Sequence, residues 1–453
     1  MGAARARNGE MASHSIDYRT FTGWIDAPSD VSPALEGELT CDVAVVGGGL
    51  GGMSTALRLA ERGVDVVLLE AEFCGHGSSS RNAGQLAGGP GGDIQLLNLL
   101  YPKRLPAIVR FAENSAHFIE ALIDRLSIEC DYEPTGNVGV AVSKGQMGKV
   151  RRVAKILAAA GATVEVGDSA ELGIPRGFIG GVREPVGGML DPGKLTMGVR
   201  RALLASTVRV FERTRVENVE ASGTGVRVSV PGGQVRANRV VLAANAFGGE
   251  LAVTPKRLAS PIWVTEVETA PIDPARLDAL GWTSRSGLVT QHAIMQNFRL
   301  TSRNTIVTGV RRLQRGKYPL SPGRTADESV VAGLLEGFRT HFPSLADVEF
   351  DRAWGGWVAV TPSWLPVAGQ VADNIHYSMG CNGHGLGQAP YLGQLIADHI
   401  AGDTPHEDLL ALWREKPRFF PAPAMSRAGL RAVWLVDRIA DWFNGGRHDD
   451  RRA

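Results

Sequence analysis

The sequence predicts a chain of the α/β (α+β) class, in which a parallel-sheet domain is discontinuous along the sequence and an antiparallel-sheet domain is inserted into it. Three observations support this prediction. The chain has 453 residues, more than the roughly 250–300 residues at which a single core stops growing. An apolar strand, a glycine-rich turn, an amphipathic helix and a second apolar strand follow one another near the N-terminus. Stretches of alternating polarity, such as residues 262–270, lie further along the chain, as in half-exposed antiparallel sheets.

Composition excludes several classes of protein. Hydrophobic residues make up 44% and charged residues 21%, which is typical of a soluble globular chain. The formal net charge is +1, so a nucleic-acid partner has no electrostatic support. The 4 cysteines form no CxxC pair, and we expect no metal site. No apolar run approaches the roughly 18 residues of a membrane span and no secretory signal is visible, so we expect a cytoplasmic protein.

The first clear motif lies at residues 41–71, which read CDVAVVGGGLGGMSTALRLAERGVDVVLLEA. The apolar run 43–46 predicts a strand that is buried on both faces. Apolar residues at i, i+3, i+4 and i+7 from Met53 predict an amphipathic helix. Gly63 is placed to end this helix, and residues 64–69 predict a second strand. This order of elements is that of a Rossmann unit.

The turn between the first strand and the helix has the GxGxxG spacing of a dinucleotide-binding loop. Its glycines allow a tight turn, a close approach to a pyrophosphate and close packing of the helix on the strand, and the helix N-terminus attracts phosphates. The acid after the second strand can accept hydrogen bonds from an adenosine ribose. We therefore expect the ADP part of NAD or FAD to contact Gly47, Gly48, Gly49, Leu50, Gly51, Gly52, Glu70 and Ala71.

A small-residue loop with one cation follows the second strand, where a further helix would be expected. It reads GHGSSSRNAGQ over residues 75–85. Such a loop can run along an extended cofactor and reach its far end. The residues expected to contact the cofactor here are Gly77, Ser78, Ser79, Arg81, Asn82, Ala83, Gly84 and Gln85.

A second glycine-rich loop precedes a helix near the C-terminus. The buried stripe of this helix is expected to be Leu392, Leu395, Ile396 and Ile400, and Pro390 suits a first helical turn. A glycine loop that leads into a helix start is a second anion site. We expect its cofactor contacts to be Gly380, Gly383, His384, Gly385, Leu386 and Gly387.

These loops resemble those of the glycine/D-amino-acid oxidase (DAO) family of flavoproteins, whose members carry a GxGxSxRNxG stretch after the ribose-binding acid. The resemblance continues in RVENV (215–219), where Val216 would flank the adenine, and in RVVLAANAF (239–247), where Ala244 would lie close to the cofactor. Residues 297–310 resemble the substrate-domain hairpin of the family, and residues 364–402 resemble its flavin-closing segment. The likeness spans roughly residues 35–443 and implies FAD as the cofactor.

Within the family, the likeness is greatest to the subfamily of bacterial gamma-glutamylputrescine oxidoreductases. It rests on LEG followed by CDV before the first strand and on the run SMGCNGHG at 378–385. It implies that the C–N bond of an amine or amino acid is oxidised to an imine by hydride transfer to flavin N5, with O2 or another acceptor taking the electrons. A gamma-glutamylated or otherwise acidic amine is the implied substrate. The alternatives are a D-amino-acid dehydrogenase or oxidase of this family, an NAD-dependent dehydrogenase and a non-catalytic flavin-binding protein.

Four side chains are candidates for catalytic roles. Arg81 could lie beside the isoalloxazine or hold loop carbonyls, and His384 could carry protons or fix its loop by hydrogen bonds. Arg299 lies on the hairpin, where it could bind a substrate carboxylate bidentately or be a solvated strand residue. Trp354 could line the substrate cavity together with Trp357, or pack in the core.

Two departures from the family pattern concern the flavin. The resemblance aligns Thr361-Pro362 with a Thr-Pro of monomeric sarcosine-oxidase relatives, which attach the flavin through a cysteine five residues before that pair. In this chain that position is Gly356. The same relatives use a lysine in the hairpin to promote the reaction with oxygen, and residues 297–310 contain none. We therefore expect non-covalent FAD, and both oxidase and dehydrogenase activity remain open.

The domain boundaries follow from these assignments. We expect an N-terminal extension at 1–35 and an FAD-binding domain at 36–105, 186–255 and 351–402. The substrate domain is expected at 106–185 and 256–350, and a helical tail at 403–453. The apolar stripe of a predicted helix near 426–443 could contact a membrane surface or a partner subunit.

Overall fold

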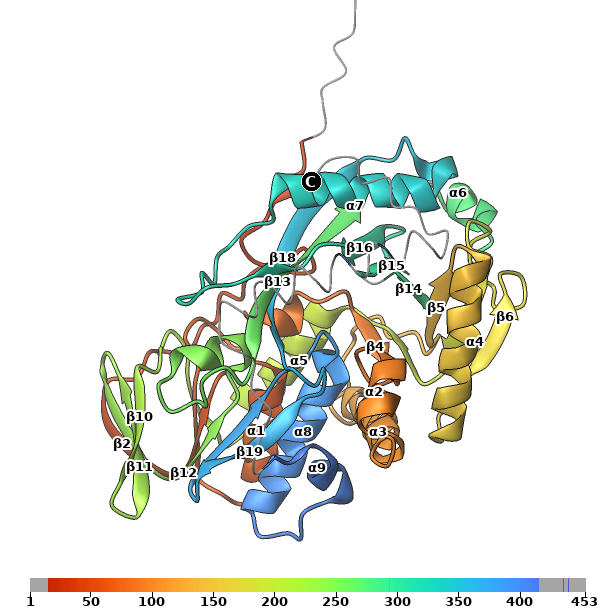
Figure 1. The fold of residues 1–453 in the computed structure, drawn as a ribbon. Helices are drawn as coiled ribbons and strands as arrows, with labels where there is room; N and C mark the ends of the chain where they lie inside the picture. The colour runs from red at the N-terminus through yellow and green to blue at the C-terminus, as the bar shows by residue number, and fades with distance from the viewer. Residues whose placement is uncertain (1–14, 293, 415–434, 436–438, 440–453) are drawn as a thin grey trace, which may run out of the picture.

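The computed structural model describes residues 15–292 and 294–414, together with Leu435 and Ile439. Within these ranges the chain forms sheets of eight, ten and two strands, which helices cover (Figure 1). The helices are α1 (Leu50–Glu61), α2 (Ile94–Leu100), α3 (Leu105–Arg125), α4 (Lys144–Ala159), α5 (Pro192–Leu204), α6 (Pro274–Ala279), α7 (Glu328–His341), α8 (Gly385–Ile400) and α9 (Glu407–Leu412). The 3-10 segments are η1 (Ser78–Ser80), η2 (Asn245–Glu250) and η3 (Pro343–Leu345).

The smaller of the two large sheets has a parallel centre, in the order β9-β3-β2-β12-β20. The first half of β12 also pairs with a meander of β11 and β10, while its second half pairs with β20. β19 lies antiparallel to β20. The strands are β2 (Gly37–Val46), β3 (Val66–Leu69), β9 (Arg209–Phe211), β10 (Asn218–Ser222), β11 (Gly225–Val230), β12 (Gly233–Leu242), β19 (Val367–Ala372) and β20 (Ile375–Met379).

Helices α1, α3, α5 and α8 bury one face of this sheet, and the meander contributes to a second core on the other face. The run 43–46 is buried on both faces, which confirms the prediction of a parallel central strand. The predicted stripe of α8 is also confirmed, because all four of its residues are buried. The placement of Pro390 in the first turn is wrong. The helix begins five residues earlier, at Gly385, because the glycine loop enters the helix directly.

The larger sheet is mixed, with the order β1-β18-β13-β16-β15-β14-β5-β7-β6, and β17 pairs with β13. Most neighbours are antiparallel, but β1 and β18 are parallel, as are β14 and β5. The prediction of half-exposed strands is wrong here. β15 and β16 are buried along their whole length and β13 along most of it, because the core under α7 covers one face and the loop at 75–85 approaches the other. Alternating polarity also does not reveal the direction of a strand's partner. The strands are β1 (Asp17–Tyr18), β5 (Asn137–Ala141), β6 (Glu165–Asp168), β7 (Gly180–Glu184), β13 (Ser260–Thr269), β14 (Gly287–Thr290), β15 (Gln296–Leu300), β16 (Ile306–Val310), β17 (Gln314–Arg315) and β18 (Phe350–Val360).

The larger sheet draws on more of the chain than the predicted substrate domain. Residues 351–360, which the sequence assigns to the FAD-binding domain, lie in β18 of this sheet, and residues 17–18 of the predicted N-terminal extension form its strand β1. Helix α3, by contrast, is assigned almost entirely to the substrate domain but packs on α8, which covers the smaller sheet. The rings of Phe111 in α3 and Tyr391 in α8 are 5.6 Å apart. The small sheet of β4 (Gln85–Ala87) and β8 (Gly187–Met189) begins where the loop at 75–85 ends. The domain boundaries themselves remain a prediction.

Among the described residues, no helix has both the length and the apolar character that crossing a bilayer requires. The predicted helix near 426–443 lies outside the described residues, apart from Leu435 and Ile439.

A buried ion pair joins helix α5 to the segment after β9. Arg200 donates to both carboxylate oxygens of Glu212, at 2.8 and 2.7 Å, and the two side chains are 3% and 0% exposed. Glu212 also accepts hydrogen bonds from the backbone N–H groups of Ser32 and Cys74, and Arg200 reaches Asp30. The pair therefore ties the N-terminal segment to the smaller sheet.

We predict that Arg200→Ala lowers the free energy of unfolding by about 3–5 kcal/mol, because Glu212 then stays buried without its counter-ion. Equilibrium unfolding in urea measures the effect. Arg227→Ala is the matched control. Its partner Glu220 and Arg227 itself are both about half exposed, so the loss should stay below about 1 kcal/mol. Equal losses in the two variants would contradict the importance of the buried pair.

Candidate functional site

Backbone, with little side chain, forms the turn between β2 and α1. Gly47 has a φ of +109°, a conformation that favours glycine. A Cβ on Gly52 would lie 1.9 Å from the carbonyl oxygen of Gly47, so the helix can approach the strand only with glycine at that position. Gly49 is the N-cap of α1 and no side chain caps it. Ser79 Oγ accepts a hydrogen bond from the Leu50 N–H at 2.9 Å.

Glu70 lies at the carboxyl end of β3, next to this turn. Its Oε2 accepts a hydrogen bond from the Gly48 N–H at 2.6 Å, and its Oε1 accepts one from the Glu72 N–H at 3.0 Å. Burial raises the pKa of Glu70 above its ordinary value. An uncapped helix N-terminus beside a fixed acid fits the pyrophosphate and ribose of a dinucleotide. The geometry thus brings together the residues that the sequence assigns to the ADP part.

The polar side chains of the loop at 75–85, called the flavin loop from here on, fix its shape and tie it to the larger sheet. Asn82 donates to the carbonyls of Ser78 and Ser79, and its Oδ1 accepts from the Gly84 N–H at 2.9 Å. Gln85 Nε2 donates to the carbonyl of Phe298 in the larger sheet at 3.2 Å. The loop therefore runs from the start of α1 to the face of the larger sheet that is opposite α7, which we call the inner face. This course is expected of a segment that follows an extended cofactor.

Arg81 holds four chain segments together. Its guanidinium donates to the carbonyls of His76, Thr20, Gly355 and Pro322 at 2.8–3.3 Å, and the side chain is 4% exposed. Burial lowers its pKa to about 10. Burial and the Arg81 charge lower the pKa of His76 to about 3, so that ring is neutral. These contacts favour the loop-holding role of Arg81 over a place beside the isoalloxazine.

The second glycine loop leads into the N-terminus of α8, which also has no side-chain cap. Asn245 Oδ1 accepts from the N–H groups of Gly380 and Cys381, at 3.2 and 3.3 Å. A Cβ on Gly383 would meet no atom within 4 Å. His384 Nδ1 lies 3.3 Å from the carbonyl of Asn382, and burial lowers the His384 pKa. A neutral histidine that contacts its own loop fits the structural role weighed for it.

Both helix starts lie at the carboxyl edge of the smaller sheet, because α1 follows β2 and α8 follows β20 and these strands run in the same direction. The two helices touch through residues without large side chains. A Cβ on Gly51 would lie 3.2 Å from the carbonyl oxygen of Ala389, and Thr55 Oγ1 donates to the carbonyl of Gly393. The chain therefore offers two uncapped helix N-termini to one extended ligand, and the residues present fit FAD.

The remaining candidates lie on the larger sheet. Arg299 is 2% exposed, so the expectation of a solvated strand residue is wrong. Its guanidinium donates to the carbonyls of Gly84 and Leu190 and lies over the ring of Trp24. Burial lowers its pKa to about 10. These carbonyls thus occupy N–H donors of Arg299 that it would need to bind a substrate carboxylate.

The two tryptophans differ in their surroundings. Trp354 is fully buried and donates to the carbonyl of Arg81 at 3.0 Å, which is the core-packing role. Trp357 packs against Trp263 and lines a small pocket together with His76, Ser78 and other residues of the flavin loop region.

Other predicted contact residues lie where their segments place them. Val216 is buried in the core on the meander side, Ala244 follows β12 at the N-cap of η2, and Ala71 is exposed beside Glu70. The structure leaves their contacts with a cofactor a prediction.

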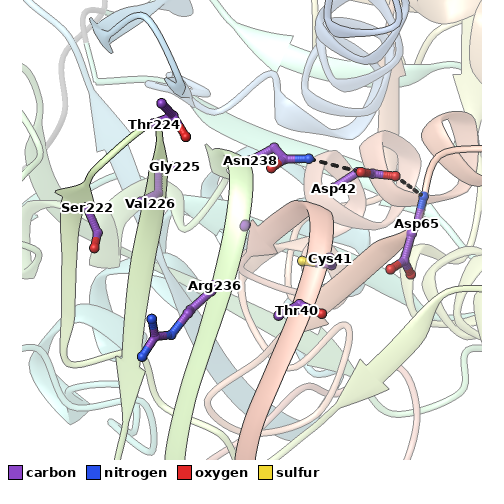
Figure 2. Close-up of a pocket in the computed structure, with 11 residues that line it drawn as sticks. Thr40, Cys41, Asp42, Asp65, Ser222, Thr224, Gly225, Val226, Arg236 and Asn238 are labelled. Atoms are coloured by element: carbon purple, nitrogen blue, oxygen red, sulfur yellow. Dashed lines mark hydrogen bonds between the residues drawn. The ribbon is translucent and has the colours of Figure 1, made fainter.

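A further pocket, of about 420 Å3, lies away from these helix starts. Figure 2 shows it between the β10–β11 turn and the amino-terminal half of the parallel strands, with Asn238 and Asp65 both hydrogen-bonded to Asp42. Ligands of open parallel sheets bind at the carboxyl ends of the strands, so this pocket contributes nothing to the candidate site. In the described part of the chain, no group of three or more His, Cys, Asp or Glu residues could hold a metal ion.

Sequence reasoning missed two residues that shape the site. Asn245 holds the second glycine loop, and its φ of +42° is a conformation that asparagine tolerates. Trp24, from the predicted N-terminal extension, donates to the carbonyl of Asn82 at 2.9 Å. Position after a strand end was a usable signal for Asn245, whereas nothing in the sequence indicates where Trp24 packs.

Comparison with known proteins agrees with this geometry. The DAO family model, described as FAD dependent oxidoreductase, matches residues 42–399. The chain is 30% identical over 413 residues to gamma-glutamylputrescine oxidoreductase of Escherichia coli (strain K12), covering 88% of this chain and 92% of that protein. It is 26% identical over 376 residues to a glycine oxidase of Pseudomonas aeruginosa, covering 80% and 95%.

Solved structures show the same fold. Glycine oxidase from Geobacillus kaustophilus superposes with a TM-score of 0.69 at 21% identity, covering 80% of this chain and 95% of that one. L-amino acid deaminase from Proteus myxofaciens gives 0.71 at 16% identity, covering 89% and 100%. The mixed sheet beside an FAD domain is therefore a shared architecture. The family model and the 30% relative confirm the resemblance seen in the motifs, and the chain belongs to the DAO family of FAD-dependent oxidoreductases.

Proposed function

We propose that this protein oxidises the C–N bond of an amine to an imine and that it holds FAD without a covalent bond. The observation that carries the proposal is the pair of helix N-termini whose N-cap residues, Gly49 and His384, provide no side-chain cap, with Glu70 fixed beside the first. FAD would supply the hydride acceptor. The chain's own part is to bind the pyrophosphate at α1, orient the substrate and exclude water.

The start of α8 supports the chemistry of reduction. Backbone N–H groups and the helix dipole favour negative charge at this position. His384 stays neutral because burial lowers its pKa. The negative charge of a reduced flavin would therefore be stabilised by the main chain and not by a titrating side chain.

The position of Gly356 supports non-covalent binding. It lies in β18, and its Cβ position is 3.3 Å from the Cβ of Arg81. The flavin loop therefore passes directly over Gly356. Because this residue is glycine, no cysteine sulfur is present at this position to bind the flavin covalently.

The substrate proposal rests on the relative at 30% identity, whose name specifies gamma-glutamylputrescine. We propose an amine of that type, with a primary or secondary amino group on an extended chain. D-amino acid dehydrogenases match at 25% and 23% identity, and D-amino acids are therefore the second substrate set to test. The contacts of Arg299 do not favour it as the carboxylate ligand.

We predict that the purified protein is yellow and that its flavin is bleached, without oxygen, by gamma-glutamylputrescine more readily than by D-alanine or D-proline. Anaerobic absorbance titration measures this order. Faster reduction by the D-amino acids would assign the second function. A bound flavin that no amine reduces would contradict an enzymatic role, and denaturation followed by filtration checks that the flavin is released.

We also predict that Gly49→Glu raises the Kd for FAD by roughly 100-fold or more, because a carboxylate at the N-cap of α1 opposes the pyrophosphate. The flavin-to-protein absorbance ratio of the purified variant measures retention. Gly333→Glu is the control, since it adds the same charge on α7, where a Cβ meets no atom within 4 Å. Full flavin retention in Gly49→Glu would argue against the site.

A further inference from the structure

A carboxylate without a counter-ion lies on the inner face of the larger sheet. Glu266, in β13, is 4% exposed and pairs with Trp354 on β18 and Gly309 on β16. The next residue, Val267, belongs to the core under α7, so Glu266 points to the opposite face. Trp354 on that face bonds to Arg81 of the flavin loop. Glu266 therefore lies on the face that the flavin loop covers.

Two buried acceptors next to each other have no hydrogen-bond partner. Asn297, across Gly309 on β15, donates from Nδ2 to Glu266 Oε1 at 3.3 Å. This leaves Glu266 Oε2 and Asn297 Oδ1 without partners. Buried polar atoms are nearly always hydrogen-bonded. Asn297 Oδ1 is an acceptor, and Glu266 Oε2 is an acceptor whenever the carboxyl is ionised. A ligand group that satisfies both oxygen atoms must have several N–H donors, and a cation would bind a carboxylate most strongly.

Gly309 makes room for this carboxylate. A Cβ at that position would lie 2.1–2.4 Å from the carboxylate atoms of Glu266. The side chain thus occupies a space that exists only because β16 has glycine there, and any larger residue would displace it.

The charged groups around Glu266 are engaged elsewhere. Glu268, on the same strand and face, pairs with Arg303 at 2.7 Å and lies 3.5 Å from Arg352. Arg299 bonds to loop carbonyls. Among the described residues none forms an ion pair with Glu266, so its acidity is set by burial, which raises the pKa to about 8.

We propose that Glu266 and Asn297 form the binding site for the ammonium group of the substrate. This inference rests on the proposed function and adds a substrate class: amines that bring a positive charge to the inner face of the larger sheet. An unpaired buried carboxylate lowers stability unless a partner arrives. A residue that destabilises the free protein while matching the ligand is typical of a binding site.

The test uses tert-butylammonium chloride on the yellow protein. This amine has no hydrogen on its α-carbon, so it binds without giving a hydride, and binding is measured apart from turnover. Above about pH 8, where the Glu266 carboxyl is ionised, we expect Glu266→Gln to weaken its binding roughly 10- to 100-fold, as for the loss of a charged hydrogen bond. The shift of the thermal unfolding midpoint and the perturbation of the flavin spectrum both report the Kd.

The pH dependence gives an independent readout. The carboxyl of the free protein is neutral below about pH 8, whereas an alkylammonium stays charged up to about pH 10. Binding therefore strengthens about tenfold per unit between pH 6 and 7 and levels off above pH 8. In Glu266→Gln the Kd should not change over this range.

Three controls separate the outcomes. Glu184→Gln removes another carboxyl of this sheet, whose pKa burial raises to about 7, and should bind tert-butylammonium as the wild type does. Gly309→Ala should weaken binding without removing the acid. Glu266→Gln should unfold at the same or a higher temperature, because it replaces an unpaired carboxyl.

Three outcomes would overturn the site: equal binding of tert-butylammonium to the wild type and to Glu266→Gln, binding of pivalate to the wild type as strong as that of tert-butylammonium, or no binding of tert-butylammonium to the wild type. The proposed function would instead fail if no oxidisable amine bleached the flavin.

Discussion

The close approach of main chain to main chain at the start of α1 is the constraint on which the rest of the structure depends. Gly52 brings the helix within contact of the Gly47 carbonyl, and Gly51 allows α8 to pack on α1. Neither N-cap residue, Gly49 or His384, caps its helix with its own side chain, and in α1 the Leu50 N–H is taken by Ser79 Oγ. The first N–H groups of both helices therefore lie at the carboxyl edge of the parallel sheet, where they could bind an anionic cofactor. The fold of this domain and its capacity to bind a dinucleotide are consequences of the same few glycines.

Two buried arginines connect this edge to the larger sheet. Arg81 and Arg299 direct their donors to carbonyls of the flavin loop and of strands on either side of it. A guanidinium in such surroundings satisfies backbone groups that a tight loop leaves without partners. Both charges are desolvated, which lowers both pKa values. The loop is thus positioned by cations that have few donors left for a ligand, and substrate recognition falls to other groups on the same face.

The inner face of the larger sheet supplies those groups. Its alternation sends Val267 and its neighbours into the core under α7 and leaves Glu266 and Asn297 toward the flavin loop. The buried acids Glu212 and Glu268 have counter-ions. Glu266 has none among the described residues. Glu266 is distinguished further by its hydrogen bond to Asn297, whose Oδ1 also lacks a partner.

The sequence by itself determined the Rossmann unit, the glycine loop before α8 and the hairpin of β15 and β16, because strand and helix periodicity and glycine spacing are local properties. It also determined the family, since its motifs are contiguous. Only the tertiary structure decided the parallel pairing of β5 with β14, the place of β18 in the larger sheet and the roles of Asn245 and Trp24. The same holds for the arginines and Glu266. Which acceptors surround a buried charge depends on segments far apart in the chain, and no local pattern records that neighbourhood.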